Sequence, residues 1–369
     1  MSNTEKKRVL MSFYTPMLQA GVPHVMMEII RNLHDKYTFD LLLNEVDKSQ
    51  VGFYDEEFLS YGGKIYYCKK VNWFKNRIGD LANLFLTILS TYRLCKKNRY
   101  DVIHCHDSNY SGAKLLGARL AGVKKRIAHS HVVYTKHASS NPIKRWVKNS
   151  LLTKMTIKHS TDRLSCSTLS GESIFTNVDF VNVLNPVNVD FFRSIEKREH
   201  NTFNMLQIGY YCSNKNQLFS VELLEKLRAS KIDAHLYFIG FALDVEYYKN
   251  LMLAVKEKSL DNFVHFMPSD VDKKEIFSII DVSLLPSFKE GFSLTAVESQ
   301  CSDIPCIASD VVCDDVDIGL LYRVNLKDID SWINAISSLS NKKLVLSEER
   351  MNKMKPNIYS KNIDKIYDL

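Results

Sequence analysis

Short apolar runs alternate regularly with amphipathic segments of helix length, and this alternation constrains the fold more than any other feature of the chain. In the first half it passes through residues 9–13, 22–33, 39–43, 81–95, 102–104, 113–121 and 126–128. Apolar runs of this length are typical of buried strands, and strands that alternate with helices are typical of βαβ units. The first half is therefore predicted to form a parallel sheet flanked by helices.

The same alternation restarts after the turn expected at Asn185-Pro186. It passes through residues 204–208, 217–227, 235–239, 263–266, 281–285 and 304–308. A chain of 369 residues also exceeds what one ordinary core organises. We therefore expect an α/β protein of two doubly wound domains, residues 1–185 and 186–350. A C-terminal helix within residues 351–369 is expected to return to the N-terminal domain.

The chain is expected to be cytoplasmic. Residues 1–8 are charged rather than apolar, and no run approaches the apolar length of a membrane-spanning helix. The eight cysteines lack paired C-x2-C spacing, and several lie in apolar runs. They are therefore expected to be reduced, packed thiols.

The net charge of +7 is divided unevenly along the chain. Residues 1–185 contain 27 Lys and Arg against 15 Asp and Glu, a net charge of +12, whereas residues 186–369 contain 22 against 27, a net charge of −5. A basic half is suited to nucleic acid, an anionic membrane surface or a phosphorylated acceptor. The basic and apolar residues at 143–155 indicate either a helix lying on an anionic membrane or a solvated helix whose apolar stripe packs in the core.

The segment after the apolar run 281–285 carries the most specific motif. It contains Glu290 and Glu298, separated by seven residues, with Gly291 beside the first. A helix beginning at Ser293 would direct its first N–H groups at the carboxyl end of the strand, where open α/β sheets bind phosphates. The two glutamates could then contact opposite ends of one elongated ligand. An isolated acidic pair near a helix start would instead only stabilise the helix dipole.

A second strand ends at Gly209 and leads through a short loop to Lys215 and Asn216 at the next helix. The Lys215 ammonium could neutralise a diphosphate leaving group there, and a solvated surface lysine fits the same pattern. The first strand leads to Gly21, whose backbone could line a ligand cleft or form a plain βα turn. The segment has only this glycine, so the G-x-G-x-x-G fingerprint is absent and a dehydrogenase is disfavoured.

Two His-x-His pairs follow strands: His104 with His106, and His129 with His131. Four imidazoles could share a zinc ion, but no acidic cluster with ligand spacing accompanies them. Alternation along a strand is expected to place one histidine of each pair on the core side. Hydrogen-bonding histidines without a metal are therefore predicted, with His131 the better candidate for a functional site.

Together these residues resemble glycosyltransferase family four, the retaining enzymes of GT-B fold, in which two Rossmann-like domains face each other across a cleft. The resemblance covers nearly the whole chain and points to bacterial enzymes of exopolysaccharide, capsule or O-antigen assembly. Its most specific part is the motif from Glu290 to Glu298. Supporting matches are Lys215-Asn216, Ser165-Cys166-Ser167 with Gly171-Glu172, and residues 305–310.

The resemblance implies a nucleotide diphosphate sugar as the donor and a saccharide, lipid-diphosphate-linked, as the acceptor. Glu290 would lie near the transferred sugar, Glu298 on the ribose and Lys215 on the diphosphate. His131 would lie beside the transferred sugar, and Gly21 would line the acceptor side. Further donor-binding positions implied by the family are Gly209, Asn216, Gly291, Phe292, Ser293 and Leu294. No metal, other cofactor or nucleic acid is implied.

The sequence departs from the family at one position, because Gly209 is followed by Tyr210 where the family usually has arginine. Losing a charge-assisted partner costs about 1.5–3 kcal/mol of leaving-group stabilisation. Three functions therefore stay open. The first is a metal-independent, retaining hexosyltransferase that uses a UDP- or GDP-sugar for bacterial surface polysaccharide at the inner membrane face. The second is a catalytically degenerate homologue that binds a nucleotide sugar or a partner, and the third is a zinc- or nucleic-acid-binding protein.

Overall fold

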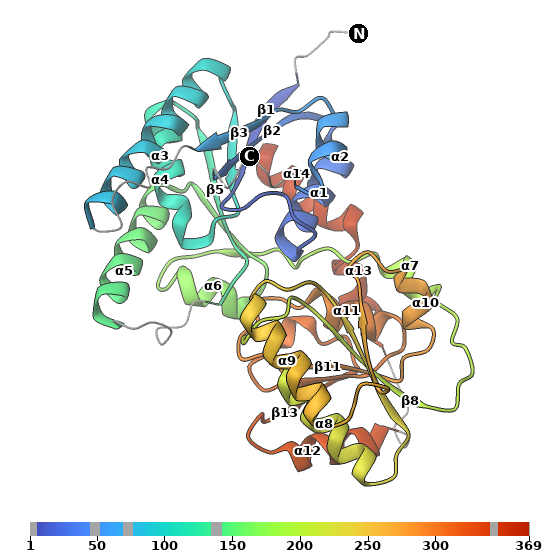
Figure 1. The fold of residues 1–369 in the computed structure, drawn as a ribbon. Helices are drawn as coiled ribbons and strands as arrows, with labels where there is room; N and C mark the ends of the chain where they lie inside the picture. The colour runs from blue at the N-terminus through green and yellow to red at the C-terminus, as the bar shows by residue number, and fades with distance from the viewer. Residues whose placement is uncertain (1–5, 45–51, 69–76, 134–141, 340–345, 369) are drawn as a thin grey trace. The chain divides into compact units, whose positions relative to one another are not determined.

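The computed structural model describes residues 6–44, 52–68, 77–133, 142–339 and 346–368 (Figure 1). The chain divides into two compact units. Unit 1 comprises Met1–Pro186 together with Pro356–Leu369, and unit 2 comprises Val187–Lys355. Both units are parallel sheets flanked by helices, so the predicted α/β fold of two doubly wound, Rossmann-like domains is confirmed.

Unit 1 is built on a seven-stranded parallel sheet in the order β3-β2-β1-β4-β5-β6-β7. Its strands are β1 (Lys7–Phe13), β2 (Tyr37–Asn44), β3 (Ile65–Cys68), β4 (Val102–Cys105), β5 (Lys125–Ser130), β6 (Asp162–Ser165) and β7 (Val181–Asn182). Its helices are α1 (Gly21–Leu33), α2 (Asp55–Ser60), α3 (Arg77–Asn98), η1 (Ser108–Ser111), α4 (Gly112–Leu120), α5 (Pro142–His159), α6 (Thr168–Ile174) and α14 (Pro356–Asp368). The strand order reverses between β1 and β4, which makes this the switch point of the sheet.

Both faces of the unit 1 sheet are covered, which explains why its central strand reads as a nearly continuous apolar run. Val9 and Met11 of β1 pack into a cluster with α1, α2 and α14. Leu10, between them, packs into a separate cluster with α4 and α6. Figure 1 shows α3, α4 and α5 on one side of this sheet and α1, α2 and α14 on the other.

The C-terminal helix belongs to unit 1, although it follows unit 2 in the chain. The expected helical segment at residues 351–369 is divided between two helices, α13 (Glu348–Lys353) and α14, because Pro356 has no N–H and occupies the first position of α14. Tyr359 and Ile363 of α14 are fully buried and pack into the cluster that contains α1. Asp364 forms an ion pair of 2.7 Å with Lys36, which precedes β2.

Unit 2 is built on a six-stranded parallel sheet in the order β10-β9-β8-β11-β12-β13. Its strands are β8 (Phe203–Ile208), β9 (Ala234–Ile239), β10 (Val264–Met267), β11 (Val282–Leu285), β12 (Cys306–Ser309) and β13 (Leu321–Val324). Its helices are α7 (Val189–Arg193), α8 (Gln217–Ala229), α9 (Val245–Glu257), α10 (Lys273–Phe277), α11 (Leu294–Cys301), η2 (Asp314–Val316), α12 (Ile329–Ser338) and α13. The switch point lies between β8 and β11, which pair in parallel.

Two further expectations concern the thiols and the membrane. All eight cysteines are free and seven of them are buried, so the prediction that most of the thiols are packed is confirmed. Across the described parts of the chain, none of the helices combines the length and the apolar character needed to cross a bilayer.

Candidate functional site

The motif with two glutamates forms a strand, a loop and a helix at the switch point of unit 2. Ser293 is the N-cap of α11, and its Oγ accepts a hydrogen bond of 3.2 Å from the Ala296 N–H. Glu290 lies in the loop, and Glu298 lies inside α11. The predicted helix start is confirmed, because the short hydroxyl side chain competes well for an early N–H group of the helix.

Glu290 is held by two side chains. Its Oε1 accepts hydrogen bonds from Lys215 Nζ at 2.5 Å and from Ser287 Oγ at 2.8 Å. The Lys215 side chain passes close to Gly209, which follows β8. Gly209 has φ of +154°, and a Cβ added there would lie 3.3–3.4 Å from the Lys215 side chain. The structure therefore brings together the lysine and the glutamate that the sequence singled out from separate motifs.

Backbone contacts fix these two loops to each other. The Phe288 N–H donates to the Asn214 carbonyl at 2.9 Å, and Asn214 Nδ2 donates to the Lys289 carbonyl at 3.1 Å. Asn216 is the N-cap of α8 in a left-handed conformation, with φ of 55°. The loop that carries Lys215 and the loop that carries Glu290 are thus joined by two hydrogen bonds.

Glu298 has a partner that sequence reasoning missed. Lys273 Nζ lies 2.9 Å from both carboxylate oxygens of Glu298, and it lies 5.5 Å from the centre of the Phe192 ring. Lys273 is the first residue of α10, whose position relative to α11 depends on the packing of the unit. The sequence around Lys273 does not show that this lysine, and not the adjacent Lys274, contacts Glu298.

Tyr210, the departure from the family pattern, turns toward an aromatic neighbour. Its ring packs edge-on against Phe241 with centroids 4.6 Å apart, and its carbonyl accepts a hydrogen bond of 2.8 Å from Gln217 Nε2. Tyrosine supplies no positive charge at neutral pH, so the charge opposite Glu290 comes from Lys215.

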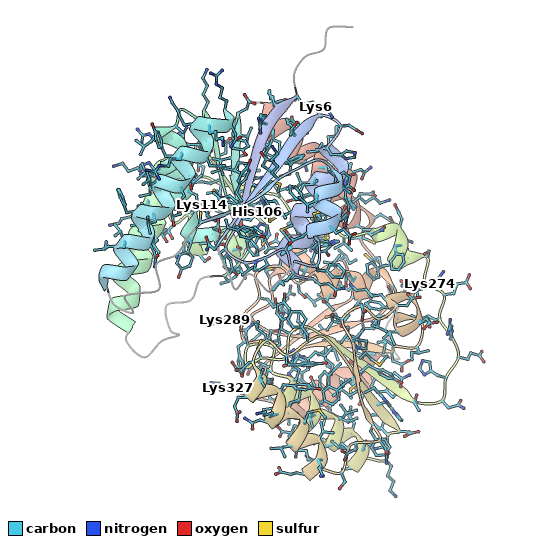
Figure 2. All side chains as sticks on the ribbon, turned by 45° about the horizontal axis from the view of Figure 1, so that its top comes forward. Lys6, His106, Lys114, Lys274, Lys289 and Lys327 are labelled. Carbon is cyan, nitrogen blue, oxygen red and sulfur yellow. The ribbon has the colours of Figure 1, made fainter. Side chains whose placement is uncertain are left out.

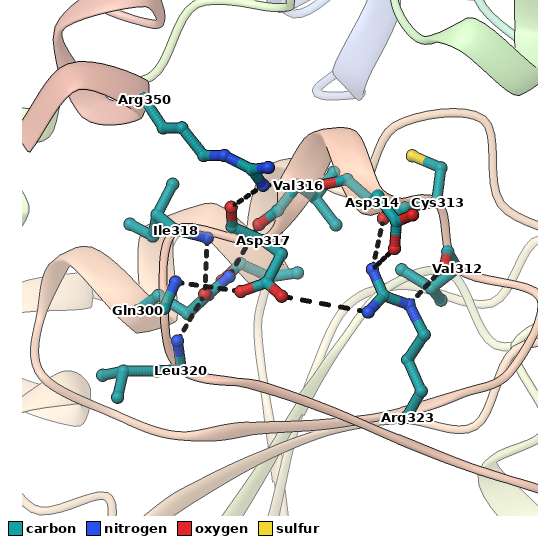
Figure 3. Close-up of polar contacts among 12 residues, drawn as sticks. Gln300, Val312, Cys313, Asp314, Val316, Asp317, Ile318, Leu320, Arg323 and Arg350 are labelled. Carbon is teal, nitrogen blue, oxygen red and sulfur yellow. Dashed lines mark hydrogen bonds and ion pairs between the residues drawn. The ribbon is translucent and has the colours of Figure 1, made fainter. Parts of the chain in front are cut away.

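Helix α11 is anchored from its buried side by Gln300 (Figure 3). Gln300 Nε2 donates to the Ala296 and Val316 carbonyls, and Oε1 accepts from the Ile318 and Leu320 N–H groups, all at 2.8–3.0 Å. The adjoining loop is held by two arginines. Arg323 donates to the carbonyls of Val312 and Cys313, and Arg350 donates to those of Asp314 and Asp317.

In unit 1, the two His-x-His pairs meet at the carboxyl ends of β4 and β5. His104 Nε2 lies 3.2 Å from His129 Nδ1, and His106 Nδ1 lies 2.9 Å from His131 Nε2. The two pairs lie against each other, with 4.1 Å between the ring centroids of His104 and His106 and of His129 and His131. Tyr367 of α14 completes the cluster, since its hydroxyl lies 2.8 Å from His104 Nδ1.

The expectation that one histidine of each pair faces the core is wrong. All four rings are buried, with between 0% and 7% of each residue exposed. Residues two apart in a strand lie on the same face, so both members of a pair enter the same environment. Burial lowers the pKa of His104 and of His131 to about 3, and it lowers the pKa of His106 and His129 well below the usual value. At neutral pH the four rings are uncharged.

The ring nitrogens also bear on the zinc hypothesis. One nitrogen each from His104, His106 and His129 lies within 4.8 Å of the others, a spacing at which the three could hold a metal ion. Zinc requires nitrogens that converge on one point at about 2.0–2.1 Å. Here His104 and His129 face each other in nearly parallel planes, 2° apart, and share a hydrogen bond. This arrangement suits hydrogen bonding between neutral rings.

Asp107 and Lys114 form a buried ion pair beside these histidines, and no local sequence pattern predicted it. Lys114 Nζ lies 3.0 Å from Asp107 Oδ1, and Ser12 Oγ donates to Asp107 Oδ2 at 2.6 Å. Figure 2 labels Lys114 and His106 close together within unit 1. Gly21 is the first residue of α1 and is exposed, so it lies at a helix start rather than in a loop.

Comparison with known proteins finds a matching protein family for each half of the chain. Residues 20–167 match the family described as Glycosyltransferase Family 4, and residues 188–361 match the family described as Glycosyl transferases group 1. The chain belongs to glycosyltransferase family four. The first match lies within unit 1, and the second covers nearly all of unit 2 together with the start of α14 and contains Lys215, Glu290 and Glu298.

Similar proteins include bacterial glycosyltransferases. The putative glycosyltransferase EpsF of Bacillus subtilis is 26% identical over 91% of this chain and 88% of its own length. The Escherichia coli UDP-Gal:alpha-D-GlcNAc-diphosphoundecaprenol alpha-1,3-galactosyltransferase is 26% identical over 77% of this chain and 78% of its own. The structure of Anabaena Alr3699/HepE in complex with UDP-glucose superposes with a TM-score of 0.71 at 13% identity, covering 98% of this chain and 97% of that one. This glycosyltransferase therefore has the GT-B fold.

Proposed function

We propose that this glycosyltransferase transfers a hexose from a UDP- or GDP-sugar to a lipid-diphosphate-linked saccharide, with retention of configuration, in the synthesis of a bacterial surface polysaccharide. The E. coli relative, named for a UDP-galactose donor and a diphosphoundecaprenol acceptor, supports both substrate classes. The HepE complex, which contains UDP-glucose, supports the donor class on a similar fold.

The contact between Lys215 and Glu290 is the observation on which the donor site depends. The two residues follow β8 and β11, the paired strands at the switch point, where open α/β sheets bind their ligands. The loop before α11 presents early N–H groups of a helix capped by Ser293, which suits a diphosphate. In this proposal Glu298, eight residues after Glu290, accepts hydrogen bonds from the ribose hydroxyls.

The proposed reaction breaks the bond between the sugar C1 and the diphosphate oxygen and forms a bond from C1 to the acceptor oxygen on the same face. The departing phosphate oxygen takes the proton of the acceptor hydroxyl, so no protein base is needed. Lys215 stabilises the negative charge that develops on the diphosphate. Since this lysine supplies the charge that a metal ion supplies in other transferases, we expect activity to persist in the presence of a chelator.

Unit 1 is the proposed acceptor-binding unit, working at the cytoplasmic face of the inner membrane. Residues 1–185 carry a net charge of +12, which attracts both an acceptor diphosphate and anionic lipid. Leu81 and Phe85, one helical turn apart on α3, are 64% and 63% exposed, and exposed apolar side chains on one helix favour the membrane interface. In the basic stretch at 143–155, the side chains up to residue 149 lie outside the described residues.

A thermal-shift screen with UDP, GDP, ADP and CMP and their sugars tests the donor site. A ligand at 100 times its dissociation constant stabilises the folded state by roughly 2.7 kcal/mol. Stabilisation by one nucleotide family supports the proposal and identifies the base. No stabilisation by any of them would refute a nucleotide-sugar site.

Transfer to a lipid-linked acceptor is then compared between the wild type, Glu298→Ala and Glu257→Ala. Glu257, an exposed residue at the end of α9, provides a control of matched chemistry. We expect Glu298→Ala to weaken donor binding while Glu257→Ala has no effect, and full activity of Glu298→Ala would refute the assigned roles. Donor binding without transfer or hydrolysis would support the degenerate homologue suggested by Tyr210.

A further inference from the structure

Each glutamate of the motif is paired with a lysine from a different part of unit 2. Glu290 contacts Lys215, which lies in the loop before α8, and Glu298 contacts Lys273, the first residue of α10. The first contact belongs to the proposed diphosphate site. The second lies at the residue proposed to bind the ribose, where the lysine has so far been given no role.

The Lys273 ammonium is shared equally by the two oxygens of the Glu298 carboxylate. Its Nζ lies 2.9 Å from Oε1 and 2.9 Å from Oε2. The last torsion of a glutamate side chain has no sharp preference, so a free carboxylate takes many orientations about it. Two charge-assisted hydrogen bonds of equal length hold the plane of this carboxylate in one orientation.

Lys273 is itself held in place by the packing around Phe192. The lysine Nζ lies 5.5 Å from the centre of the Phe192 ring, within the range of a cation–π attraction. That ring packs against Phe277 of α10 with centroids 5.3 Å apart. Ser302, the C-cap of α11, donates from its Oγ to the Phe192 carbonyl at 3.2 Å. Phe192 thus joins the helix that carries Lys273 to the helix that carries Glu298.

The contact with Lys273 leaves each oxygen of Glu298 free to accept a second hydrogen bond. An ionised carboxylate offers about four acceptor positions, two on each oxygen, and the lysine uses one on each. The Glu298 side chain is 12% exposed, so it is not sealed from solvent. A ribose presents two neighbouring hydroxyl groups, at C2′ and C3′. One remaining position on each oxygen therefore matches one hydroxyl group each.

Lys273 also offsets the negative charge of Glu298, and this effect differs from orientation in what it predicts. A nucleoside diphosphate is anionic, so a neighbouring cation favours the binding of every such ligand alike. Fixing the plane of the carboxylate favours the ligands that carry both hydroxyl groups. A 2′-deoxyribonucleotide has the same charge as the ribonucleotide and lacks one hydroxyl group, so it separates the two effects.

We propose that Lys273 is a positioning residue that sets the carboxylate plane of Glu298 for the two ribose hydroxyl groups, so that the site selects ribonucleotides over 2′-deoxyribonucleotides. This role rests on the proposed function, in which Glu298 accepts hydrogen bonds from the ribose. Because Lys273 acts through Glu298, its effect is expected on the affinity for the nucleotide.

The test compares the binding of UDP, GDP and their 2′-deoxy counterparts to the full chain by titration calorimetry. We expect the wild type to bind the ribonucleotide of one base about tenfold more tightly than its deoxy form, the effect of one hydrogen bond to a charged group. In Lys273→Met this preference should be lost. Lys274→Met is the matched control, because the adjacent Lys274 is exposed (Figure 2), and it should keep the wild-type preference.

Two further variants separate orientation from charge and from folding. Lys273→Arg keeps hydrogen-bond donors for both carboxylate oxygens and should restore the preference. In a Glu298→Ala background, Lys273→Met should have no further effect on the preference.

Three results would overturn the proposal, and they are distinguishable. If Lys273→Met weakens the binding of the ribo and deoxy forms by the same factor, the lysine acts through charge or stability alone. A wild type that binds both forms equally would overturn the positioning role and leave the proposed donor site intact. A wild type that binds no nucleotide would refute the proposed function and the positioning role with it.

Discussion

Tyr210 is the residue at which this glycosyltransferase departs most from its family. Its ring packs against Phe241, and among the described residues Lys215 is the cation that forms an ion pair with Glu290. A guanidinium at position 210 would add a second charge-assisted contact to the donor diphosphate, worth about 1.5–3 kcal/mol. We therefore predict that Tyr210→Arg raises kcat/KM about tenfold or more, measured as initial rates of transfer at subsaturating donor.

Tyr210→Phe is the matched control for this prediction. It keeps the ring contact with Phe241 and removes only the hydroxyl, so the rate should stay close to that of the wild type. A Tyr210→Arg protein that remains folded but gains no rate would show that the diphosphate does not approach this position. If Tyr210→Phe is as slow as an inactive variant, the hydroxyl itself contacts the donor.

At the scale of single elements, α11 shows how a buried side chain positions a functional one. Gln300 is fully buried and lies two residues after Glu298. Gln300→Leu would leave the Ile318 and Leu320 N–H groups without acceptors, at about 1–3 kcal/mol each. We predict that unit 2 loses about 3 kcal/mol or more of its free energy of unfolding in denaturant titrations, and that the donor KM rises.

Gln300→Glu serves as the comparison, because it keeps an oxygen for the two N–H groups and removes only the Nε2 donor to Ala296 and Val316. It should be less destabilising than Gln300→Leu, provided that the titration is done where the carboxyl is protonated. If the two variants unfold alike, the bonds to Ile318 and Leu320 do not hold α11 in place.

The elements around the proposed donor site were largely predictable, because each depends on residues close together in the sequence. A strand followed by Gly291, Ser293 and an apolar helix specifies its own turn and N-cap. Lys273 was not predictable, because its contact with Glu298 depends on the packing of α10 against α11 rather than on any local pattern. The pairing of His106 with His131 likewise depends on the register between β4 and β5.

At the scale of the whole molecule, unit 1 is formed by two separate stretches of the chain. Unit 1 is completed by α14, which is joined to the rest of that unit only through the intervening unit 2. Tyr359 and Ile363 fill the core beside α1, and Tyr367 closes the histidine cluster. Sequence patterns located a C-terminal helix near residues 351–369, but the buried contacts of these side chains span more than half of the chain and leave no local signature.

Because α14 packs in the core of unit 1, a destabilising substitution in α14 is expected to lower the stability of unit 1. Ile363 is fully buried in the core of unit 1, and an isoleucine-to-alanine change in such a core costs about 2–5 kcal/mol. We predict that Ile363→Ala lowers the unfolding temperature of unit 1 and leaves that of unit 2 unchanged, although residue 363 follows unit 2 in the chain. Scanning calorimetry measures both transitions, and a nucleotide that binds the proposed donor site would identify the transition of unit 2 by raising it. Lys361→Ala, an exposed change on the same helix, is the control and should shift neither transition. If Ile363→Ala lowers both transitions equally, the two units unfold as one cooperative body, and the independence of unit 2 is refuted.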